Sequence, residues 1–217
     1  EFRRVLFRSI SRLHQAFPGL TKLYSIGKST EGRDLWCIEV TARGVGNPDR
    51  KPGMYVSGNI HGDEVQAGEM VAYTAWYLCH QYGRLDRITT LLDNYVFYLL
   101  PTVNPDGRDF WLATSTGAMS GRTGSTPIDN DRDGIADEDA CDDLDGDGTI
   151  TMMRIKDPQG RHKKHPDYPA YLMARAKPEE PGEYTLLGWE GIDNDGDGRV
   201  NEDGRGGYDL NRNWARD

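Results

Sequence analysis

Residues 53–101 constrain the fold most, because two short strand-like segments there flank a long helical one. The segments "GMYVSGNI" (53–60) and "NYVFYLLP" (94–101) are rich in β-branched and aromatic residues and are bounded by glycine or proline, which is typical of strands. Between them, residues 64–83 place apolar side chains at helical spacing and end at a glycine, and a second helix is expected over about 84–92. Strand, helix and strand in this order indicate an α/β fold in which helices cover the sheet.

The flanking segments divide into a folded part and a long polar part. "DLWCIEVTA" (34–42) is expected to form another strand, and residues 11–20 a short helix that stops at a Pro-Gly pair. Residues 1–10 are basic and lack an apolar signal-peptide core, so we expect a non-native or disordered leader and leave it out of the fold. Gly, Ser, Thr, Pro and Asp dominate residues 108–207, interrupted by one short helix expected over 168–176. This stretch is predicted to be a long Asp/Gly-rich insertion and not a second hydrophobic domain.

The negative charge of the chain is concentrated in two short segments. Residues 129–147 hold ten Asp or Glu against one Arg, and residues 193–203 hold five against one. These segments carry net charges of −9 and −4, whereas the whole chain carries −9, so the remaining residues sum to about +4. Local acidity of this kind indicates cation sites. Nucleic acid is not expected as a partner, since no basic stripe with interleaved aromatic residues occurs. No apolar run approaches the roughly 20 residues of a membrane span.

The acidic segments repeat one pattern. "IDNDRDGIADED" (128–139) and "IDNDGDGRVNED" (192–203) align without gaps, 64 residues apart, and a partial copy begins at Asp143. Asp-x-Asp-x-Asp-Gly sets carboxylates at alternate positions of a tight loop, and hard oxygen ligands at this spacing suit Ca²⁺ better than Mg²⁺. The loops lack the glutamate that EF-hands carry at position 12, and they resemble the calcium loops of dockerin and thrombospondin type-3 repeats. The alternative is a solvated surface loop. The candidate calcium ligands are Asp129, Asp131, Asp133, Asp137, Asp143, Asp145, Asp147, Asp193, Asp195 and Asp197.

A His-x-x-Glu pair lies where the strand over 53–60 gives way to the helix over 64–83. His61 and Glu64 can direct an imidazole and a carboxylate toward one point beyond the carboxyl end of that strand, where open α/β sheets bind their ligands. Zn²⁺ accepts both ligand types, and a catalytic zinc site uses three protein ligands and a water. Taken alone the pair is a weak signal, and the alternative is two polar residues at an ordinary helix start.

Two further stretches give the pair its context. "LLPTVNPDG" (99–107) and "GGYDLNRNW" (206–214) follow "HGDE" in that order, and "SIGKSTEGRDLWCIEV" precedes it. In this arrangement residues 11–217 resemble the M14 family of zinc carboxypeptidases. The resemblance implies a three-layer α/β/α fold with a mixed, mostly parallel sheet. It further implies that residues 11–217 are the N-terminal portion of that domain, incomplete at its C-terminal side, with residues 108–207 as an insertion.

The resemblance also implies roles for particular residues. His61 and Glu64 match two of the family's zinc ligands, and Asn211 and Arg212 match the pair that grips the substrate's terminal carboxylate, which a planar guanidinium does bidentately. Arg154 is the candidate for the arginine that polarises the scissile carbonyl. The family's third zinc ligand, a histidine, and its catalytic glutamate follow the Asn-Arg pair. We therefore expect both to be missing here and the fragment itself to be inactive.

The expected function is zinc-dependent hydrolysis of the C-terminal residue of peptides that have a free C-terminus. One alternative is an amidase of the same family acting on cell-wall peptides. Another is a secreted calcium-binding scaffold or adhesion module that has lost catalysis. Zn²⁺ and Ca²⁺ are the expected cofactors, and a monomer is expected. Calcium loops of this kind fill where free Ca²⁺ is near millimolar, which predicts a secreted or periplasmic protein. The sequence gives no indication of side-chain specificity.

Overall fold

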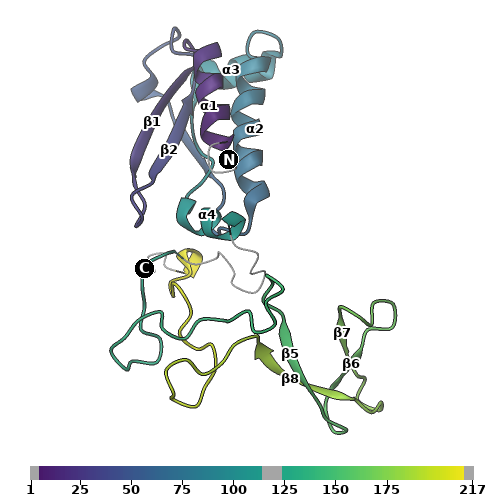
Figure 1. Cartoon of the computed structure of the whole chain (residues 1–217). Helices are drawn as coiled ribbons and strands as arrows, with labels where there is room; N and C mark the ends of the chain where they lie inside the picture. The colour runs from purple at the N-terminus through teal and green to yellow at the C-terminus, as the bar shows by residue number, and fades with distance from the viewer. Residues whose placement is uncertain (1–4, 114–123, 213–217) are drawn as a thin grey trace. The chain divides into compact units, whose positions relative to one another are not determined.

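The computed structural model describes residues 5–113 and 124–212, which form two compact units (Figure 1). The first unit consists of residues 5–113, 124–128 and 205–212, and the second of residues 129–204. Each unit contains its own four-stranded sheet. Among the described helices, none combines the length and the apolar character that crossing a bilayer requires.

The sheet of the first unit combines parallel and antiparallel strands. Its strands are β1 (Thr21–Lys28), β2 (Asp34–Val40), β4 (Val96–Leu100) and β3 (Gly53–Ser57), in that spatial order. β1 and β4 pair antiparallel with β2, whereas β3 pairs parallel with β4 across a helical crossover. The expected α/β class and mixed sheet are confirmed. Within the described residues, however, only the β3–β4 pairing is parallel. A short hairpin makes β1 antiparallel to β2, and β4 also runs antiparallel to β2, so these four strands are not mostly parallel.

Helices α1 (Val5–Ala16) and α2 (Val65–Gln81) cover one face of this sheet. They pack against each other and against the strands, and α3 (Asp86–Asn94) follows α2 (Figure 1). Strand residues Ile38, Val40 and Leu99 belong to the same apolar core as buried side chains of α1 and α2. Tyr55 lies on the opposite face of β3 and is 57% exposed. Of the three layers expected, these elements provide the sheet and one helical layer.

Helix α1 begins earlier than the sequence pattern suggested. Leu6 and Ile10 are 5% and 2% exposed, and with Leu13 they form the buried stripe of an amphipathic helix. The exclusion of residues 1–10 from the fold is therefore wrong for residues 5–10, because they belong to α1 and the side chains of Leu6 and Ile10 are buried against the rest of the unit. Residues 1–4 lie outside the described part of the chain.

Two glycines allow α2 to approach the strand ends closely. A Cβ on Gly58 would lie 2.6 Å from the carbonyl oxygen of Ala67, and a Cβ on Gly68 would lie 2.7 Å from that of Pro101. Side chains at these positions would push the first turns of α2 away from the ends of β3 and β4. The close approach places the β3–α2 turn, which contains the His-x-x-Glu pair, beside α4 (Pro105–Ala113).

The sheet of the second unit is antiparallel throughout the pairings described. Its strands are β5 (Met152–Lys156), β8 (Tyr184–Trp189), β6 (His162–Lys164) and β7 (Met173–Arg175), in that spatial order. The short helix expected over 168–176 is wrong. A turn occupies Tyr168–Tyr171 and β7 follows it. A proline at position 169 disfavours a helical conformation at the residue before it, and pairing with β6 then extends the chain.

Candidate functional site

The turn between β3 and α2 presents His61 from a constrained backbone. Asn59 has a positive φ of 58°, and its buried amide donates to the carbonyl oxygens of His61 at 2.6 Å and Gly62 at 3.1 Å. Asn tolerates the left-handed conformation better than most residues because its short side chain can bond to nearby backbone in this way. The turn therefore fixes the direction of the imidazole before any ligand binds.

Both ring nitrogens of His61 face carboxylates. Nδ1 lies 3.0 Å from Oε1 of Glu64, and Nε2 lies 3.0 Å from Oδ1 of Asp209, while the residue as a whole is 4% exposed. Two ligand atoms bound to tetrahedral zinc at about 2.0–2.2 Å lie about 3.3–3.5 Å apart. The spacing of His61 Nδ1 and Glu64 Oε1 is close to this, so the pair fits a shared zinc ion. The contact with Asp209 fits the carboxylate that commonly orients a ligating histidine.

Asp209 is the functional candidate that sequence reasoning missed. It precedes the 3-10 turn η3 (Leu210–Arg212), accepts a hydrogen bond from the amide of Asn211 at 2.9 Å through Oδ1, and accepts one from the amide of Arg212 at 2.9 Å through its carbonyl. The same carboxylate thus contacts His61 and shapes the turn that carries Asn211 and Arg212. The aspartate of "DLNRNW" was visible in the sequence, but its partner lies 148 residues away.

The predicted substrate-binding pair differs in exposure. Arg212 is exposed. Within the described residues, the hydrogen bond of its guanidinium runs from Nη1 to the neighbouring carbonyl oxygen of Asn211, at 3.1 Å. Asn211 is half-buried in the same turn. Asp209 therefore links the turn that carries Asn211 and Arg212 to His61, which lies beside Glu64.

The β3–α2 turn is held from behind by the segment that follows β4. Asn104 donates from its backbone to the carbonyl of Asn59 at 3.2 Å and from its side chain to that of Ile60, also at 3.2 Å. Its side-chain oxygen in turn accepts from the amide of Gly107 at 2.8 Å, inside α4. The "NPDG" motif consequently supports the turn that presents His61.

A buried ion pair anchors α4 to the β1–β2 hairpin. Asp106, 4% exposed, accepts from Ser29 Oγ at 2.7 Å and Arg33 Nη1 at 2.6 Å, and Arg33 Nε lies 2.9 Å from Asp109. Burial alone would raise the pKa of Asp106, but the hydrogen bonds from Ser29, the Glu31 amide and Arg33 outweigh it and hold that pKa below its usual value. The pair ties the hairpin to the helix that supports the site.

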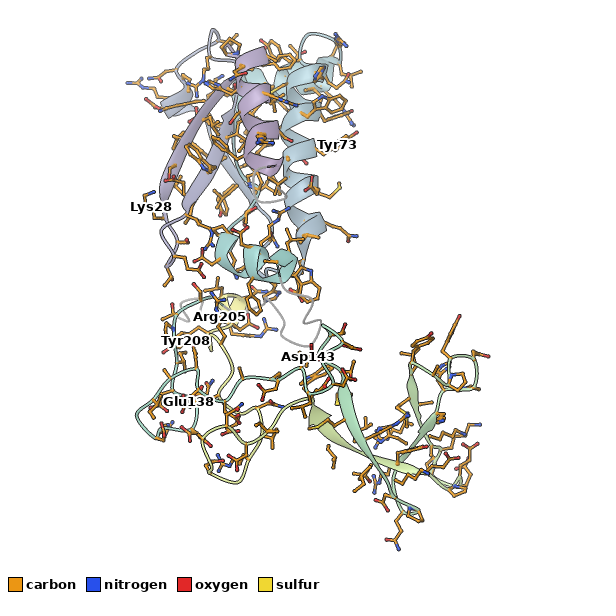
Figure 2. All side chains as sticks on the ribbon, in the orientation of Figure 1. Lys28, Tyr73, Glu138, Asp143, Arg205 and Tyr208 are labelled. Atoms are coloured by element: carbon orange, nitrogen blue, oxygen red, sulfur yellow. The ribbon has the colours of Figure 1, made fainter. Side chains whose placement is uncertain are left out.

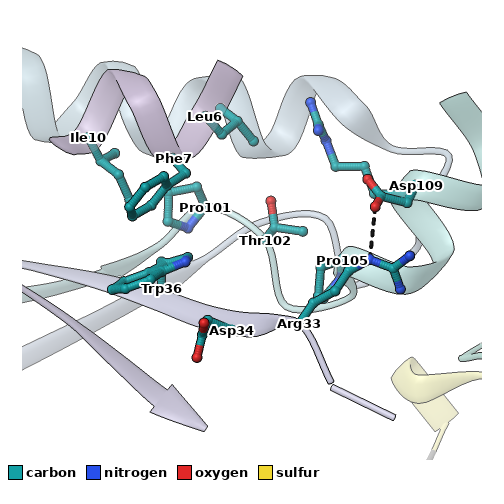
Figure 3. Close-up of a pocket in the computed structure, with 11 residues that line it drawn as sticks. Leu6, Phe7, Ile10, Arg33, Asp34, Trp36, Pro101, Thr102, Pro105 and Asp109 are labelled. Carbon is teal, nitrogen blue, oxygen red and sulfur yellow. Dashed lines mark ion pairs between the residues drawn. The ribbon is translucent and has the colours of Figure 1, made fainter. Parts of the chain in front are cut away.

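A cavity of about 360 Å³ lies beside this ion pair. Figure 3 shows its lining, in which Phe7 and Ile10 from α1 face Trp36 from β2, and Arg33 and Asp109 close one side. His61 is not among its lining residues. The cavity is thus separate from the predicted zinc ligands His61 and Glu64.

Arg154, the predicted carbonyl-polarising residue, lies in the second unit. It belongs to β5, its guanidinium stacks over the Tyr184 ring with 4.8 Å between Cζ and the ring centroid, and Nη1 lies 2.8 Å from Met173 Sδ. These contacts account for its position on the second sheet. Its proposed catalytic role stays a prediction.

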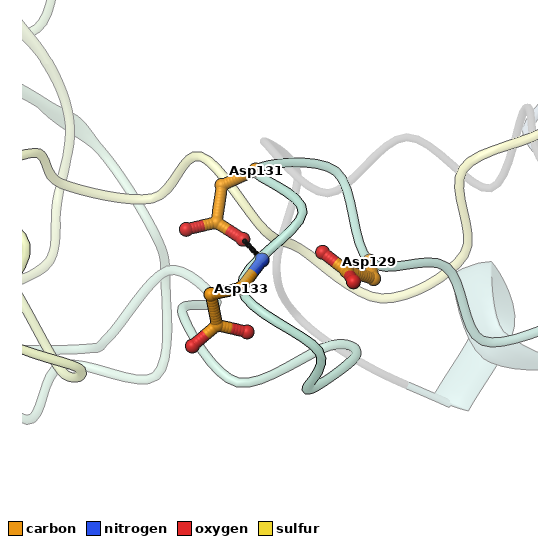
Figure 4. Close-up of side chains that lie close together, drawn as sticks. All are labelled: Asp129, Asp131 and Asp133. Carbon is orange, nitrogen blue, oxygen red and sulfur yellow. Dashed lines mark hydrogen bonds between the residues drawn. The ribbon is translucent and has the colours of Figure 1, made fainter.

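The acidic loops share one hydrogen-bond pattern. In the first, Asp129 accepts from the amides of Arg132 at 2.5 Å and Gly134 at 3.0 Å, and Asp131 accepts from that of Asp133 at 3.0 Å (Figure 4). Ligand atoms of Asp129, Asp131 and Asp133 lie within 4.8 Å of one another. The same bonds recur in the other copies, which start at Asp193 and Asp143. The structure thus brings the predicted ligands of the first loop together, and calcium binding stays a prediction.

Glu190 is a second residue that sequence reasoning missed. It is 6% exposed, and its carboxylate accepts from the amides of Leu144 at 2.8 Å, Asp145 at 3.1 Å and Thr151 at 3.2 Å. It also lies within 4.8 Å of ligand atoms of Asp143 and Asp145. Glu190 lies 46 residues from Leu144 and 45 from Asp145 along the chain, so no local motif marks it.

Comparison with known proteins gives consistent relatives. The zinc carboxypeptidase family (peptidase family M14) matches residues 6–145. Carboxypeptidase Z of Homo sapiens is 34% identical over 182 residues, covering 81% of this chain and 26% of the relative. Carboxypeptidase Z of Rattus norvegicus is 40% identical over 134 residues, covering 59% and 20%. Carboxypeptidase D of Drosophila melanogaster is 35% identical over 120 residues, covering 55% and 8%.

The chain thus spans less than a third of each of these relatives. Among solved structures, bovine thrombin-activatable fibrinolysis inhibitor in complex with tick carboxypeptidase inhibitor is similar at a TM-score of 0.47 and 18% identity, covering 67% of this chain and 45% of that one. The family match covers well over half of the sequence and includes the His61–Glu64 turn and the "NPDG" motif. The chain therefore belongs to the zinc carboxypeptidase family.

Proposed function

We propose that the protein of which this chain forms part is a zinc-dependent metallocarboxypeptidase that removes the C-terminal residue of peptides with a free C-terminus. The observation that supports it most is the arrangement of His61, whose one ring nitrogen faces Glu64 and whose other faces Asp209. Membership of the zinc carboxypeptidase family is consistent with it. When bound, zinc polarises the scissile carbonyl and lowers the pKa of its water.

Each residue of the chain has a distinct part in this proposal. His61 and Glu64 hold the zinc, and Asp209 accepts the Nε2 proton of His61, which leaves the Nδ1 lone pair free for the metal. Arg212, with Asn211 beside it, binds the terminal carboxylate of the peptide bidentately. Arg154 stabilises negative charge that develops on the scissile carbonyl oxygen. The third zinc ligand and the general base remain predictions from the family pattern, since His14, His80, His162 and His165 all precede Asn211.

The experiment measures release of the C-terminal residue by the whole protein. A zinc chelator should abolish release and added Zn²⁺ should restore it, whereas His61→Gln should abolish release without restoration. His14→Gln is the matched control, because His14 bonds to Thr21 between α1 and β1. Release that continues unchanged in chelator would refute the zinc mechanism.

Arg212→Lys tests the carboxylate grip. Lysine keeps the charge but loses the bidentate geometry. For free-acid peptides, the transition-state stabilisation calculated from kcat/KM should therefore fall by about 1.5–3 kcal/mol, the value of a charged hydrogen bond. Peptides with an amidated C-terminus should lose much less. An equal loss on both substrates would remove Arg212 from the carboxylate site.

The calcium loops and the location of the protein belong to the same proposal. The acidic loops bind Ca²⁺, supported by the carboxylates that converge in the second unit. Modular sites of this kind have Kd values of about 10⁻⁴–10⁻³ M, which only extracytoplasmic calcium fills, so the protein is secreted or periplasmic. Uptake of no Ca²⁺ at millimolar concentration in equilibrium dialysis would refute calcium binding and remove this argument for the location.

A further inference from the structure

The two full acidic repeats are joined by matching hydrogen bonds. Repeat 1 is residues 128–139 and repeat 2 is residues 192–203. Asn130 donates from its amide and its side chain to Oδ1 of Asp203, at 3.2 and 2.9 Å. Asn194 donates in the same way to Oδ1 of Asp139, at 3.1 Å for both. Asp139 and Asp203 also form an antiparallel bridge. Because each bond has its counterpart 64 residues along, the repeats face each other as a pair.

Carboxylates from both repeats converge across this boundary. Ligand atoms of Asp133, Glu138 and Asp195 lie within 4.8 Å of one another. A second group, Asp197, Glu202 and Asp131, does the same. Adding 64 to the repeat 1 residues of the first group, and subtracting 64 from its repeat 2 residue, produces the second group. The two groups are therefore equivalent, and each takes members from both repeats.

Several of these carboxylate oxygens are buried without a hydrogen-bond donor in the described residues. They are both oxygens of Glu138, both oxygens of Glu202, and Oδ2 of Asp203. Asp203 is 0% exposed, and one of its oxygens lies within 4.8 Å of ligand atoms of Asp131 and Glu138. A buried carboxylate that is neither hydrogen-bonded nor paired with a cation is strongly disfavoured. The unpartnered oxygens therefore point to a ligand between the repeats.

We propose that this ligand is a pair of Ca²⁺ ions shared by the two repeats. One ion is held by Asp133, Glu138 and Asp195, and the other by Asp197, Glu202 and Asp131. Each glutamate then closes a site that includes a carboxylate of the opposite repeat. This inference rests on the calcium binding proposed above, and it changes the unit of binding from a single loop to the pair of loops.

The chemistry of the ligands favours calcium. Every ligand atom is a carboxylate oxygen, and each group offers three carboxylates, whereas Mg²⁺ usually binds through one or two and keeps several of its waters. The first aspartate of each loop is already engaged, since Asp129 and Asp193 use both oxygens for backbone amides of their own loops. These two residues organise the loops, while the unpartnered oxygens lie at the boundary between the loops.

A double-mutant cycle on the full chain tests the sharing. Glu138→Gln and Asp195→Asn are made singly and together, and Ca²⁺ affinity is measured by isothermal titration. If both residues hold one ion, each single substitution should lower the affinity for that ion by at least about tenfold. The fold loss of Ca²⁺ affinity in the double variant should then be far smaller than the product of the two single fold losses, because residues that share a partner are coupled.

The third acidic copy supplies the matched control. Asp145 occupies the position in that copy that Asp195 occupies in repeat 2, and it faces Glu190. Asp145→Asn combined with Glu138→Gln should multiply the two single effects without coupling. Calcium binding in which Glu138 and Asp195 act independently would overturn the sharing and leave calcium binding by single loops. If the unaltered protein takes up no calcium, both the sharing of ions and calcium binding by single loops are overturned. The separate proposal of zinc-dependent peptide hydrolysis does not depend on this outcome.

A second measurement avoids substitutions that could disturb folding. Limited proteolysis of the unaltered protein is followed over a calcium titration. Shared ions predict that cleavage within residues 129–139 and within residues 193–203 is suppressed at the same Ca²⁺ concentration. Protection of one repeat at a concentration that leaves the other fully cleaved would contradict the proposal.

Discussion

The two units of this chain are stabilised by different kinds of buried group. In the first unit the core is a cluster of apolar side chains, with Ile38, Val40 and Leu99 at 0% exposure under two helices. In the second unit the residues at 0% exposure are Asp139 and Asp203, and β5 is almost wholly exposed. Figure 2 shows Glu138 and Asp143 among the acidic side chains of this unit.

This difference concerns what each unit requires in order to fold. Apolar burial contributes about 25 cal/mol per Å² without any partner from solution. Buried carboxylates contribute stability only when hydrogen bonds or cations compensate for lost hydration. We therefore expect the first unit to fold on its side chains alone and the second to depend on bound cations.

The largest effect is expected from a cavity in the apolar core of the first unit. Leu99→Ala should lower its free energy of unfolding by about 2–5 kcal/mol, because removal of the fully buried β4 side chain leaves a void in the core between the sheet and its helices. Ile155→Ala is the matched control on a strand of the second unit. Ile155 is 53% exposed, so the change should stay within about 0.5 kcal/mol. Denaturant unfolding followed by segment-resolved hydrogen exchange measures both, and equal effects would remove the contrast.

Removal of calcium is expected to act on the second unit selectively. At a free Ca²⁺ concentration of a hundred times Kd, each ion stabilises by about 2.7 kcal/mol through mass action. A calcium chelator should therefore accelerate amide exchange across residues 129–204 and leave the sheet of the first unit protected. Exchange that rises equally in both units, or in neither, would show that the second unit does not depend on cations.

The buried carboxylate of Asp106 in the first unit should not depend on calcium, because its charged partner is Arg33 of the same unit. Asp106→Asn leaves Arg33 facing a neutral amide, and loss of a charged hydrogen bond costs about 1.5–3 kcal/mol. The loss should be the same with and without calcium. A calcium-dependent loss would contradict the assignment of Asp106 to an ion pair internal to the first unit.

The two units should also respond to pH in opposite directions in metal-free protein. Burial, together with the neighbouring Asp203 or Asp139, raises the pKa of Glu138 and of Glu202 from 4.5 to about 7. A carboxyl group whose pKa is raised in the folded state contributes stability at pH values below 4.5, and this contribution is lost as the pH rises through about 7. In the presence of a chelator, amide exchange over residues 129–204 should therefore be faster at pH 8 than at pH 5.

The pKa of Asp106 is shifted in the opposite direction from those of Glu138 and Glu202. Its pKa is held below the ordinary value of 3.8, so its contribution is present above that value and is lost as pH falls through the lowered pKa. The first unit should therefore be unchanged between pH 8 and pH 5 and destabilise only in stronger acid. Hydrogen exchange at several pH values, corrected for the intrinsic rate, measures both units in one sample. A first unit that weakens between pH 8 and pH 5 would disprove this sign.

Short-range patterns made much of the first unit predictable. The bounds of β3, α2, α3 and β4 lie close to those expected, because periodic apolar residues and terminating glycines act within a few residues of chain. The same is true of the acidic loops, whose aspartates bond to amides two to five residues away. Helix α1 was shortened in the prediction, because the basic residues before Ser11 obscured the apolar stripe of Leu6 and Ile10.

Local sequence patterns were enough to predict the α/β class, the strand–helix turn that carries His61 and Glu64, and the acidic repeat. The distant carboxylates that these groups contact became known from the folded chain. Asp209 reaches His61, and Asp203 reaches Asn130, across separations of 148 and 73 residues. An aspartate looks the same in sequence whether it caps a loop, orients a histidine or faces another repeat. Its partner depends on the path of the whole chain, which no local pattern contains.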